Sequence, residues 1–405
     1  MTNSIAITQI GLCTPLGHTP QQVLGKLLAG DTSAMVLRDD LMFNANTRVG
    51  AIDEAQLKAI PESLQQFDCR NNQLLYTAAL QLDKTIAQAK LQFGPSRIGV
   101  VIGTSTSGIS KGEAALAYHA VHGEFPPTYH YAQQELGSTS DFLRQYFKLS
   151  GPCYTVSTAC SSSTKVFASA KRLLNAGLCD LVIVGGVDSL CQLTLNGFNA
   201  LESVAADLCN PFSKHRDGIN IGEAAALFTL QKSTPHTEQI ILAGIGESSD
   251  AHHISAPHPQ GTGAIAAMNN ALSDANITPK QISYVNLHGT ATPKNDAMES
   301  LAMQQVFGNT DNIPLCSSTK PLVGHCLGAA GAIEAAFCYL LLSQYNDKQA
   351  LPPQVWDQQQ DPDNPLLPLV TQNQSTAVNY IMSNSFAFGG SNASIILGRS
   401  RAQHD

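Results

Sequence analysis

Short apolar stretches alternate with longer amphipathic ones along most of this chain. Strands buried on both faces are predicted where nearly every side chain is apolar or small, at residues 97–103, 180–188 and 282–288. Shorter strands are predicted at residues 5–12, 154–157, 223–231, 240–246, 314–318 and 380–385. Apolar residues at helical spacing predict helices at residues 20–28, 73–89, 111–122, 139–147, 165–175 and 261–275. Strands that alternate with helices in this way indicate an α/β fold.

The second half of the chain repeats the pattern of the first. Residues 154–175 read as a strand, a turn of small residues and a helix, and residues 314–336 follow the same order. Residues 380–385 likewise parallel residues 181–185, and both stretches lead to a double glycine. We therefore predict two related halves, at residues 1–235 and 236–405.

The helix predicted after His325 consists mostly of alanine and glycine, from Gly328 to Ala336. Side chains this small let neighbouring elements approach closely, so we expect this helix to lie buried between two sheets. Parallel strands buried on both faces also need helices on their outer sides. Both observations fit five layers, in the order α/β/α/β/α.

Composition narrows the class of protein. The chain has 405 residues, of which 43% are hydrophobic, and this fits a compact enzyme larger than one ordinary core. The first residues lack a basic leader, and no apolar run has the length of a membrane span. Its 10 cysteines are scattered without CxxC spacing, as in proteins of a reducing cytoplasm. The net charge of −8 argues against general nucleic-acid binding.

Cys160 is the candidate nucleophile. It lies in the segment YTVSTACSSS, between a predicted strand and a predicted helix. Unpaired N–H groups and the helix dipole at such a position favour a thiolate, and the small neighbours leave room for a substrate. The alternative is that Cys160 is one of several small buried apolar residues.

Two histidines occupy similar positions in the second half. His288 ends a predicted strand, and His325 lies between Gly324 and the alanine-rich helix. Ligands of doubly wound sheets gather at turns of this kind. Either histidine alone could be structural, but a cysteine and two histidines, all at strand-to-helix turns, indicate a catalytic site.

Four motifs together resemble the β-ketoacyl-acyl-carrier-protein synthases of the thiolase-like superfamily. They are TACSSS around Cys160, HGTATPKND from His288, KPLVGHCLGAAG from Lys320 and NSFAFGGSN from Asn384. The N-terminal segment fits as well, so the resemblance covers essentially the whole chain. One cysteine with two histidines resembles the elongating enzymes, because thiolases and initiating synthases carry a different third residue.

The resemblance implies a decarboxylating Claisen condensation. Cys160 would take an acyl group from a carrier thioester, with its own N–H and that of Phe388 as the oxyanion hole. His288 and His325 would then bind the thioester carbonyl of malonyl-carrier protein. Loss of carbon dioxide leaves an enolate, whose carbon attacks the acyl group on Cys160. This chemistry implies no metal or organic cofactor.

Supporting roles also follow from the resemblance. Lys320 and Glu334 would form an ion pair that orients the histidines, and Asp296 and Glu299 would support the turn at His288. Thr290 and Thr292 would contact the phosphopantetheine arm through their hydroxyls. Phe386, Ala387 and Phe388 would form a gate between the acyl tunnel and the second substrate, with Phe386 as a substrate contact. A further substrate contact is predicted at Thr106, in the turn after residues 97–103.

The expected partner is an acyl carrier protein, with substrates held on its phosphopantetheine. The family also implies a dimer, either of two identical chains or with a second ketosynthase. Lys214 and Arg216 are candidates for docking the carrier, whereas residues 65–73 offer only Arg70. The His-rich stretch at residues 250–258 fits no common metal site, so we expect no metal there.

Some features depart from the family pattern. Ala387 replaces a glycine of the gate segment, and INIGEAAALF replaces a glycine-rich run. These differences favour a specialised polyene or polyketide pathway over bulk fatty-acid synthesis. Two alternatives to an elongating ketosynthase remain: a non-catalytic partner of the chain-length-factor type, and a Cys-His hydrolase of thioesters.

Overall fold

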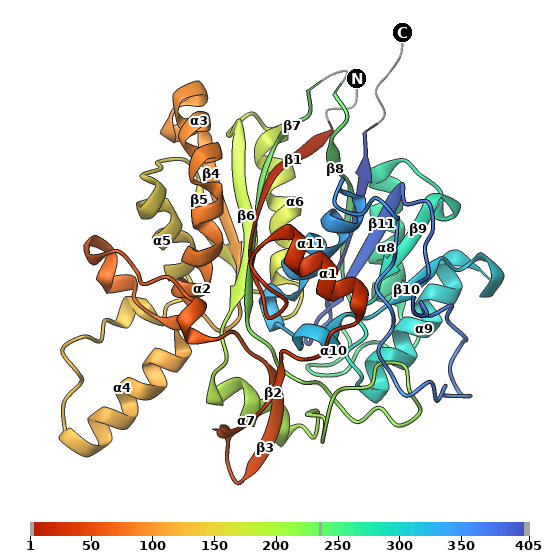
Figure 1. The fold of residues 1–405 in the computed structure, drawn as a ribbon, viewed down its shortest axis with the longest axis horizontal. Coiled ribbons are helices and arrows are strands. Elements are labelled where there is room, and N and C mark those ends of the chain that lie inside the picture. Colours follow the sequence, from red (N-terminus) through yellow and green to blue (C-terminus); the bar gives the residue numbers. More distant parts are fainter. Residues whose placement is uncertain (1–3, 235–236, 309, 401–405) are drawn as a thin grey trace.

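Ten strands form one continuous sheet in the computed structural model, which describes residues 4–234, 237–308 and 310–400 (Figure 1). Five strands come from the first half of the chain: β1 (Ile5–Cys13), β4 (Ile98–Gly103), β5 (Cys153–Val156), β6 (Leu181–Asp188) and β7 (Ala224–Lys232). Five come from the second: β8 (Ile240–Ser249), β9 (Ile282–Asn286), β10 (Leu315–Ser317), β11 (Tyr380–Phe386) and β12 (Ser391–Arg399). The strand order is β10-β9-β11-β12-β8-β1-β7-β6-β4-β5.

The two sets of five strands have the same topology. In the first set, β4 pairs in parallel with β5 and β6, while β7 runs antiparallel to β6 and β1. In the second set, β9 pairs in parallel with β10 and β11, while β12 runs antiparallel to β11 and β8. A short antiparallel pairing of β1 with β8 joins the sets. The predicted repeat is therefore present, although the expected boundary at residues 235 and 236 lies outside the described residues.

Helices arrange these strands into the five predicted layers. α6 (Ser162–Asn175) and α11 (Ala330–Leu342) pack against each other between the two sets of strands and contact both. The outer face of the first set is covered by α2 (Arg70–Ala79), α3 (Asp83–Phe93) and α5 (Ser138–Phe147). The outer face of the second is covered by α8 (Thr262–Ala275) and α9 (Pro293–Phe307). Together they form a thiolase-like α/β fold.

The alanine-rich helix lies where its composition predicts. Every residue of α11 except Tyr339 is buried. A side-chain carbon at Gly331 would lie 1.9 Å from Thr164 Oγ1 of α6, so a larger residue could not keep this helix contact. Small side chains thus allow the two central helices to approach closely.

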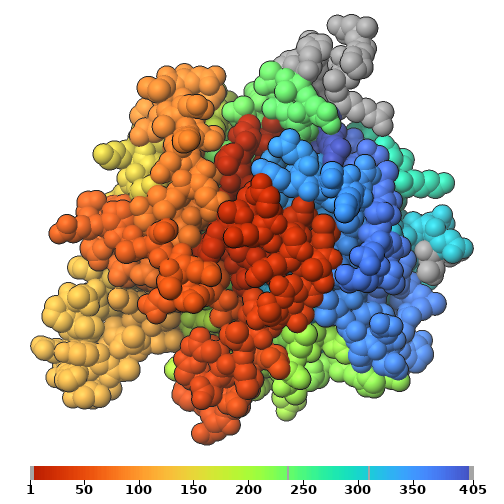
Figure 2. Space-filling view, in the orientation of Figure 1, coloured from red at the N-terminus to blue at the C-terminus, as the bar shows by residue number. Residues whose placement is uncertain are grey.

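The remaining elements lie around these layers. α1 (Pro20–Ala29) begins at Thr19, whose hydroxyl accepts a hydrogen bond from the Gln22 N–H, and it packs on α11. Strands β2 (Met35–Met42) and β3 (Ala45–Gly50) form a hairpin. Two further helices of the first half are α4 (Ile109–His122) and α7 (Gln192–Ala200), and the single turn α10 (Lys320–Val323) precedes His325. Figure 2 shows N-terminal residues in red, lying between the two halves on this face. In the described part of the chain, no helix is both long and apolar enough to cross a bilayer.

The structure differs from the prediction at several elements. The helix predicted at residues 73–89 is divided by a 3-10 turn at Leu80–Leu82. At this turn the Gln81 side chain hydrogen-bonds both the N–H and the carbonyl of Leu12 in β1, a tertiary contact that local periodicity does not contain. Helix α9 and strand β12 were not predicted, although both complete the second half.

Candidate active site

Cys160 lies at the tip of a tight turn between β5 and α6. Ala159 has a φ of 50°, which is unusual for a residue other than glycine. The Ser162 hydroxyl holds the turn, because it accepts from the Thr158 N–H and donates to the Ala159 carbonyl. The N-terminal end of α6 packs closely against β4, so that a side-chain carbon at Gly103 of β4 would lie 2.5 Å from the backbone of Ser163. The strand-turn-helix predicted around Cys160 is therefore confirmed.

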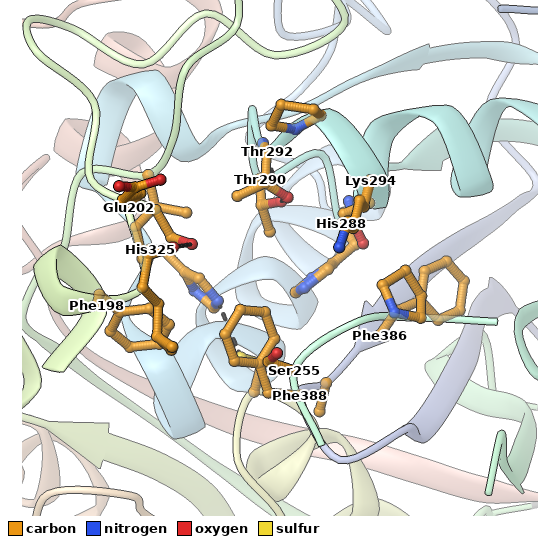
Figure 3. Close-up of a pocket in the computed structure, with 18 of the residues that line it drawn as sticks. Phe198, Glu202, Ser255, His288, Thr290, Thr292, Lys294, His325, Phe386 and Phe388 are labelled. Atoms are coloured by element: carbon orange, nitrogen blue, oxygen red, sulfur yellow. Dashed lines mark hydrogen bonds between the residues drawn. The ribbon is translucent and has the colours of Figure 1, made fainter. Parts of the chain in front are cut away.

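Both predicted histidines face Cys160. The Nε2 atom of His325 lies 3.1 Å from the Cys160 Sγ atom, and the His288 and His325 rings meet edge-on with centroids 5.3 Å apart. The Cys160 sulfur and one imidazole nitrogen of each histidine lie within 4.8 Å of one another. All three side chains are at least 95% buried. Figure 3 shows the two imidazole rings pointing toward a common space.

Buried carboxylates hold the turn that carries His288. The two carboxylate oxygens of Glu299 accept hydrogen bonds from the N–H groups of His288 and Gly289, each at 2.8 Å. Burial raises the pKa of Glu299 to about 7, although these hydrogen bonds act in the opposite direction. Asp296 accepts from the Ala291 N–H of the same turn and from the Phe212 N–H. Both carboxylates thus support this turn, as expected.

Lys320 and Glu334 form a buried ion pair with an Nζ–Oε1 distance of 2.6 Å. The second oxygen of Glu334 has no hydrogen-bond partner among the described residues. Burial raises the pKa of Glu334, and the Lys320 charge opposes that rise. The Lys320 side chain of this pair acts electrostatically on His288, His325 and Cys160.

Electrostatics keeps both histidines neutral. Burial, followed by the Lys320 charge, lowers the pKa of His288 and of His325 well below the usual value. Burial also raises the pKa of the Cys160 thiol to about 11, although the Phe388 N–H, the Lys320 charge and the N–H of Cys160 favour the thiolate. The N–H groups at this turn thus favour the thiolate, as expected, but burial outweighs them.

A cavity of about 270 Å³ leads from Cys160 to the surface. Its walls include the predicted substrate residues Thr290, Thr292 and Phe386 and the predicted oxyanion residue Phe388. In Figure 3, Thr290 and Thr292 lie on one side of the two histidines and the Phe388 ring on the other. The Phe388 ring packs against Phe198 of α7, with centroids 5.4 Å apart.

Thr106 does not line this cavity. Its side chain is fully buried, and its hydroxyl donates to the Asp188 carboxylate at 2.8 Å. The structure therefore does not support a substrate contact for Thr106, because Asp188 occupies the hydroxyl that a substrate would need.

The candidate docking residues differ in exposure. Lys214 is exposed, whereas the Arg216 side chain is only 7% exposed and pairs with Asp361 at 2.6 Å. Arg70 forms a bidentate pair with the fully buried Glu223 and is also committed to the fold. Of the three candidates, only Lys214 is free to meet a partner.

In the gate segment, the residues with a left-handed backbone conformation come after Ala387. Gly389 and Gly390 have φ values of 82° and 74°, and Ala387 is not among the residues with positive φ. The Gly389 N–H donates to the Ile254 carbonyl, which ties the segment to residues 250–258. Alanine at 387 is therefore compatible with this conformation.

Some cavity residues were not predicted. The cavity walls also include Phe198, Glu202, Ser255, Pro257, Lys294 and Asn392. Asn392 and Lys294 lie within the quoted motifs, so the motifs could have indicated them. Ser255 and Pro257 lie in the His-rich stretch at residues 250–258, which resembles a segment near the family's active-site entrance. Phe198 and Glu202 come from α7 and the loop after it, whose position depends on tertiary packing.

Comparisons with known proteins agree with this geometry. The family described as Beta-ketoacyl synthase, N-terminal domain, matches residues 2–236, and its C-terminal domain matches residues 240–355. This chain belongs to the β-ketoacyl synthase family. The predicted resemblance is therefore confirmed.

Several relatives are similar over different lengths. Nodulation protein E of Rhizobium meliloti is 36% identical over 251 residues, which span 60% of this chain and 61% of that protein. 3-Oxoacyl-[acyl-carrier-protein] synthase 2 of Coxiella burnetii is 29% identical over 98% of both chains. A chain of the solved complex of the ketosynthase ApeO with its chain length factor ApeC, from Xenorhabdus doucetiae, is 43% identical over 98% of both chains, with a TM-score of 0.92.

Proposed function

We propose that this chain is an elongating 3-oxoacyl-acyl-carrier-protein synthase, an acyltransferase that condenses an acyl thioester with malonyl-carrier protein. The observation that carries the proposal is the buried group of Cys160, His288 and His325 at the base of an open cavity. Residues 1–235 would supply the nucleophile and residues 236–405 the two histidines. Family membership supports the same reaction.

In the first half-reaction, Cys160 takes the acyl group. His325 Nε2 is 3.1 Å from the sulfur and is neutral, so it can accept the thiol proton as the sulfur attacks the carbonyl. A thiolate formed only during attack is compatible with the raised pKa of the free thiol. The N–H groups of Cys160 and Phe388 bind the oxyanion, and the departing phosphopantetheine thiolate takes the proton.

In the second half-reaction, malonyl-carrier protein enters along Thr290 and Thr292, with the gate at Phe386 and Phe388. Its thioester carbonyl lies between His288 and His325. The bond to the carboxylate breaks, carbon dioxide leaves, and the electron pair forms an enolate that an N–H group of each imidazole stabilises. For His325 this requires the neutral tautomer with the proton on Nε2, so its ring exchanges a proton with solvent between the two half-reactions. The enolate carbon then attacks the acyl group, the Cys160 thiolate departs, and it takes up one proton from solvent, which the reaction consumes overall.

The Lys320–Glu334 pair fits a supporting role in this scheme. The positive charge of Lys320 opposes protonation of both histidines. Neutral histidines favour decarboxylation, because an imidazolium would stabilise the malonyl carboxylate and so hinder its loss as carbon dioxide. The decarboxylation itself generates the carbon nucleophile. The reaction therefore requires no metal or organic cofactor.

The proposal includes partners and setting. Substrates arrive on the phosphopantetheine of an acyl carrier protein, and the chain acts in the cytoplasm as a homodimer or with a second ketosynthase-like chain. The pathway is fatty-acid, polyene or polyketide synthesis. The alternative role, a non-catalytic chain-length-factor partner, has no use for a complete Cys-His-His group.

Reconstitution tests the proposal directly. The chain is incubated with acyl-carrier protein and malonyl-carrier protein, alone and with a candidate partner chain, and the carrier products are resolved by mass. We expect a 3-oxoacyl product two carbons longer than the acyl substrate, lost in the Cys160→Ala variant. Hydrolysis of the acyl thioester without elongation would favour the hydrolase. Elongation that needs the partner chain and survives Cys160→Ala would favour the non-catalytic partner.

A further inference from the structure

Asp188, the last residue of β6, is a fully buried carboxylate. None of the ion pairs among the described residues includes Asp188. Instead, one oxygen accepts four hydrogen bonds, all between 2.7 and 2.8 Å, from Thr104 Oγ1, the Ser105 N–H and both the N–H and Oγ1 of Thr106. The other oxygen accepts one, from the Ala329 N–H at 2.8 Å.

These hydrogen bonds join the two sides of the active site. On one side, the Ser105 hydroxyl donates to the carbonyl of Ala159, the residue before the nucleophile. On the other side, Ala329 belongs to the 3-10 turn Leu327–Ala329 that follows His325, and Leu327 has a strained φ of 46°. Asp188 is thus the carboxylate through which the Cys160 turn and the His325 turn are fixed to one strand.

The packing around Asp188 leaves no room for another arrangement. A side-chain carbon at Gly328 would lie 2.6 Å from Ser105 Oγ and 2.9 Å from Asp188 Oδ2. A side-chain carbon at Gly186, two residues earlier in β6, would lie 2.9 Å from the Ala329 Cα. Two glycines therefore allow β6 and the His325 turn to meet at the carboxylate.

We infer that Asp188 is a positioning residue that sets the distance between His325 and Cys160 by clamping the turns that carry them. The inference rests on the proposed function. A carboxylate suits this role because it can accept hydrogen bonds from both turns at once, with no competing donor of its own. Since the His325 backbone is also held by hydrogen bonds with Asn220 and Gly222, loss of the clamp should misplace the ring without releasing it.

Asp188→Asn is the informative variant. Its amide oxygen can keep the four hydrogen bonds to residues 104–106, but its NH₂ group then faces the Ala329 N–H, donor against donor. We expect malonyl-carrier protein decarboxylation and condensation to fall about tenfold or more in kcat with little change in KM. Asp180→Asn, at an exposed carboxylate just before β6, is the matched control and should match the parental enzyme.

A second readout separates this role from a general loss of stability. The Asp188 charge raises the pKa of Cys160, so its removal should move the pH profile of Cys160 alkylation by iodoacetamide to lower pH. Alkylation does not depend on the proposed reaction. If the parental enzyme itself fails to condense, the proposed function is wrong. If it condenses and a folded Asp188→Asn variant has parental kcat, the clamp is wrong, whatever the alkylation profile shows.

If Asp188→Asn does not fold, Gly328→Ala tests the same contact with Asp188 intact. Its added carbon pushes the His325 turn away from Ser105 and Asp188. Reduced decarboxylation in a folded Gly328→Ala enzyme supports the clamp, and parental decarboxylation overturns it.

Discussion

The Nε2 atom of His325 lies 3.1 Å from the sulfur of Cys160, although 165 positions separate the two residues in the chain. The repeat explains this proximity. Cys160 follows β5 and His325 follows β10, which occupy equivalent positions in the two sets of strands. Each is followed by one of the two central helices, α6 and α11, which pack against each other. The catalytic group is therefore assembled where the two halves meet.

His288 should be needed for condensation more than for acylation, whereas His325 should be needed for both, because it also accepts the Cys160 thiol proton. Each of His288→Ala and His325→Ala removes a donor aimed at the enolate oxygen, a loss of about 3 kcal/mol or about a hundredfold in rate. Decarboxylation of malonyl-carrier protein by the pre-acylated enzyme is the measurement. Parental decarboxylation in either variant would show that the altered histidine does not bind the enolate.

The pH dependence of Cys160 should reflect its burial. Because its pKa is raised to about 11, the thiolate fraction is small at neutral pH and grows as the pH rises toward 11. The rate of alkylation by iodoacetamide should thus increase about tenfold per pH unit from pH 7 to 10. The Cys160→Ala variant gives the background from the other cysteines. A rate that levels off near pH 8.5, as for an ordinary thiol, would contradict this environment.

The gate should depend on its glycines more than on Ala387. Gly389→Ala would place a side chain at a φ of 82° and destabilise the present gate conformation by about 1 kcal/mol, although nothing lies within 4 Å to clash with it. Ala387→Gly relieves no such strain here, so it should affect turnover only if the open gate needs positive φ at 387. Turnover across acyl chain lengths distinguishes these cases. If Ala387→Gly accepts a broader range of acyl chains, Ala387 restricts the open conformation of the gate. If Gly389→Ala turns over every acyl chain at the parental rate, the argument from strain at residue 389 is contradicted.

Docking of the carrier protein should depend on Lys214 and not on Arg216. Lys214→Glu should raise the KM for an acidic carrier protein several-fold at low salt, with turnover at saturation unchanged. Arg216→Ala should instead lower the melting temperature, because it leaves Asp361 without its buried partner. A KM unaffected by Lys214→Glu at low salt would place docking on another surface.

The sequence predicted those elements and residues that a pattern within a short stretch of the chain identifies. Apolar runs indicated β4, β6 and β9, and motifs at strand ends indicated Cys160, His288 and His325. Contacts between distant segments were not predictable in this way. Arg216 pairs with Asp361, 145 positions away, which leaves its side chain largely buried and paired. Asp188 meets Ala329 across 141 positions, and the raised pKa of Cys160 arises from burial that appears only once all layers are assembled.

The most direct test of the account is the fate of an acyl group on Cys160. The enzyme is incubated with acyl-carrier protein, and peptide mass spectrometry locates the adduct before and after malonyl-carrier protein is added. We expect a single acyl adduct on Cys160, absent from the Cys160→Ala variant, that disappears on addition of malonyl-carrier protein as 3-oxoacyl product forms. An adduct on another cysteine, or a Cys160 adduct that malonyl-carrier protein does not consume, would contradict the assignment of Cys160, His288 and His325 as the condensing group.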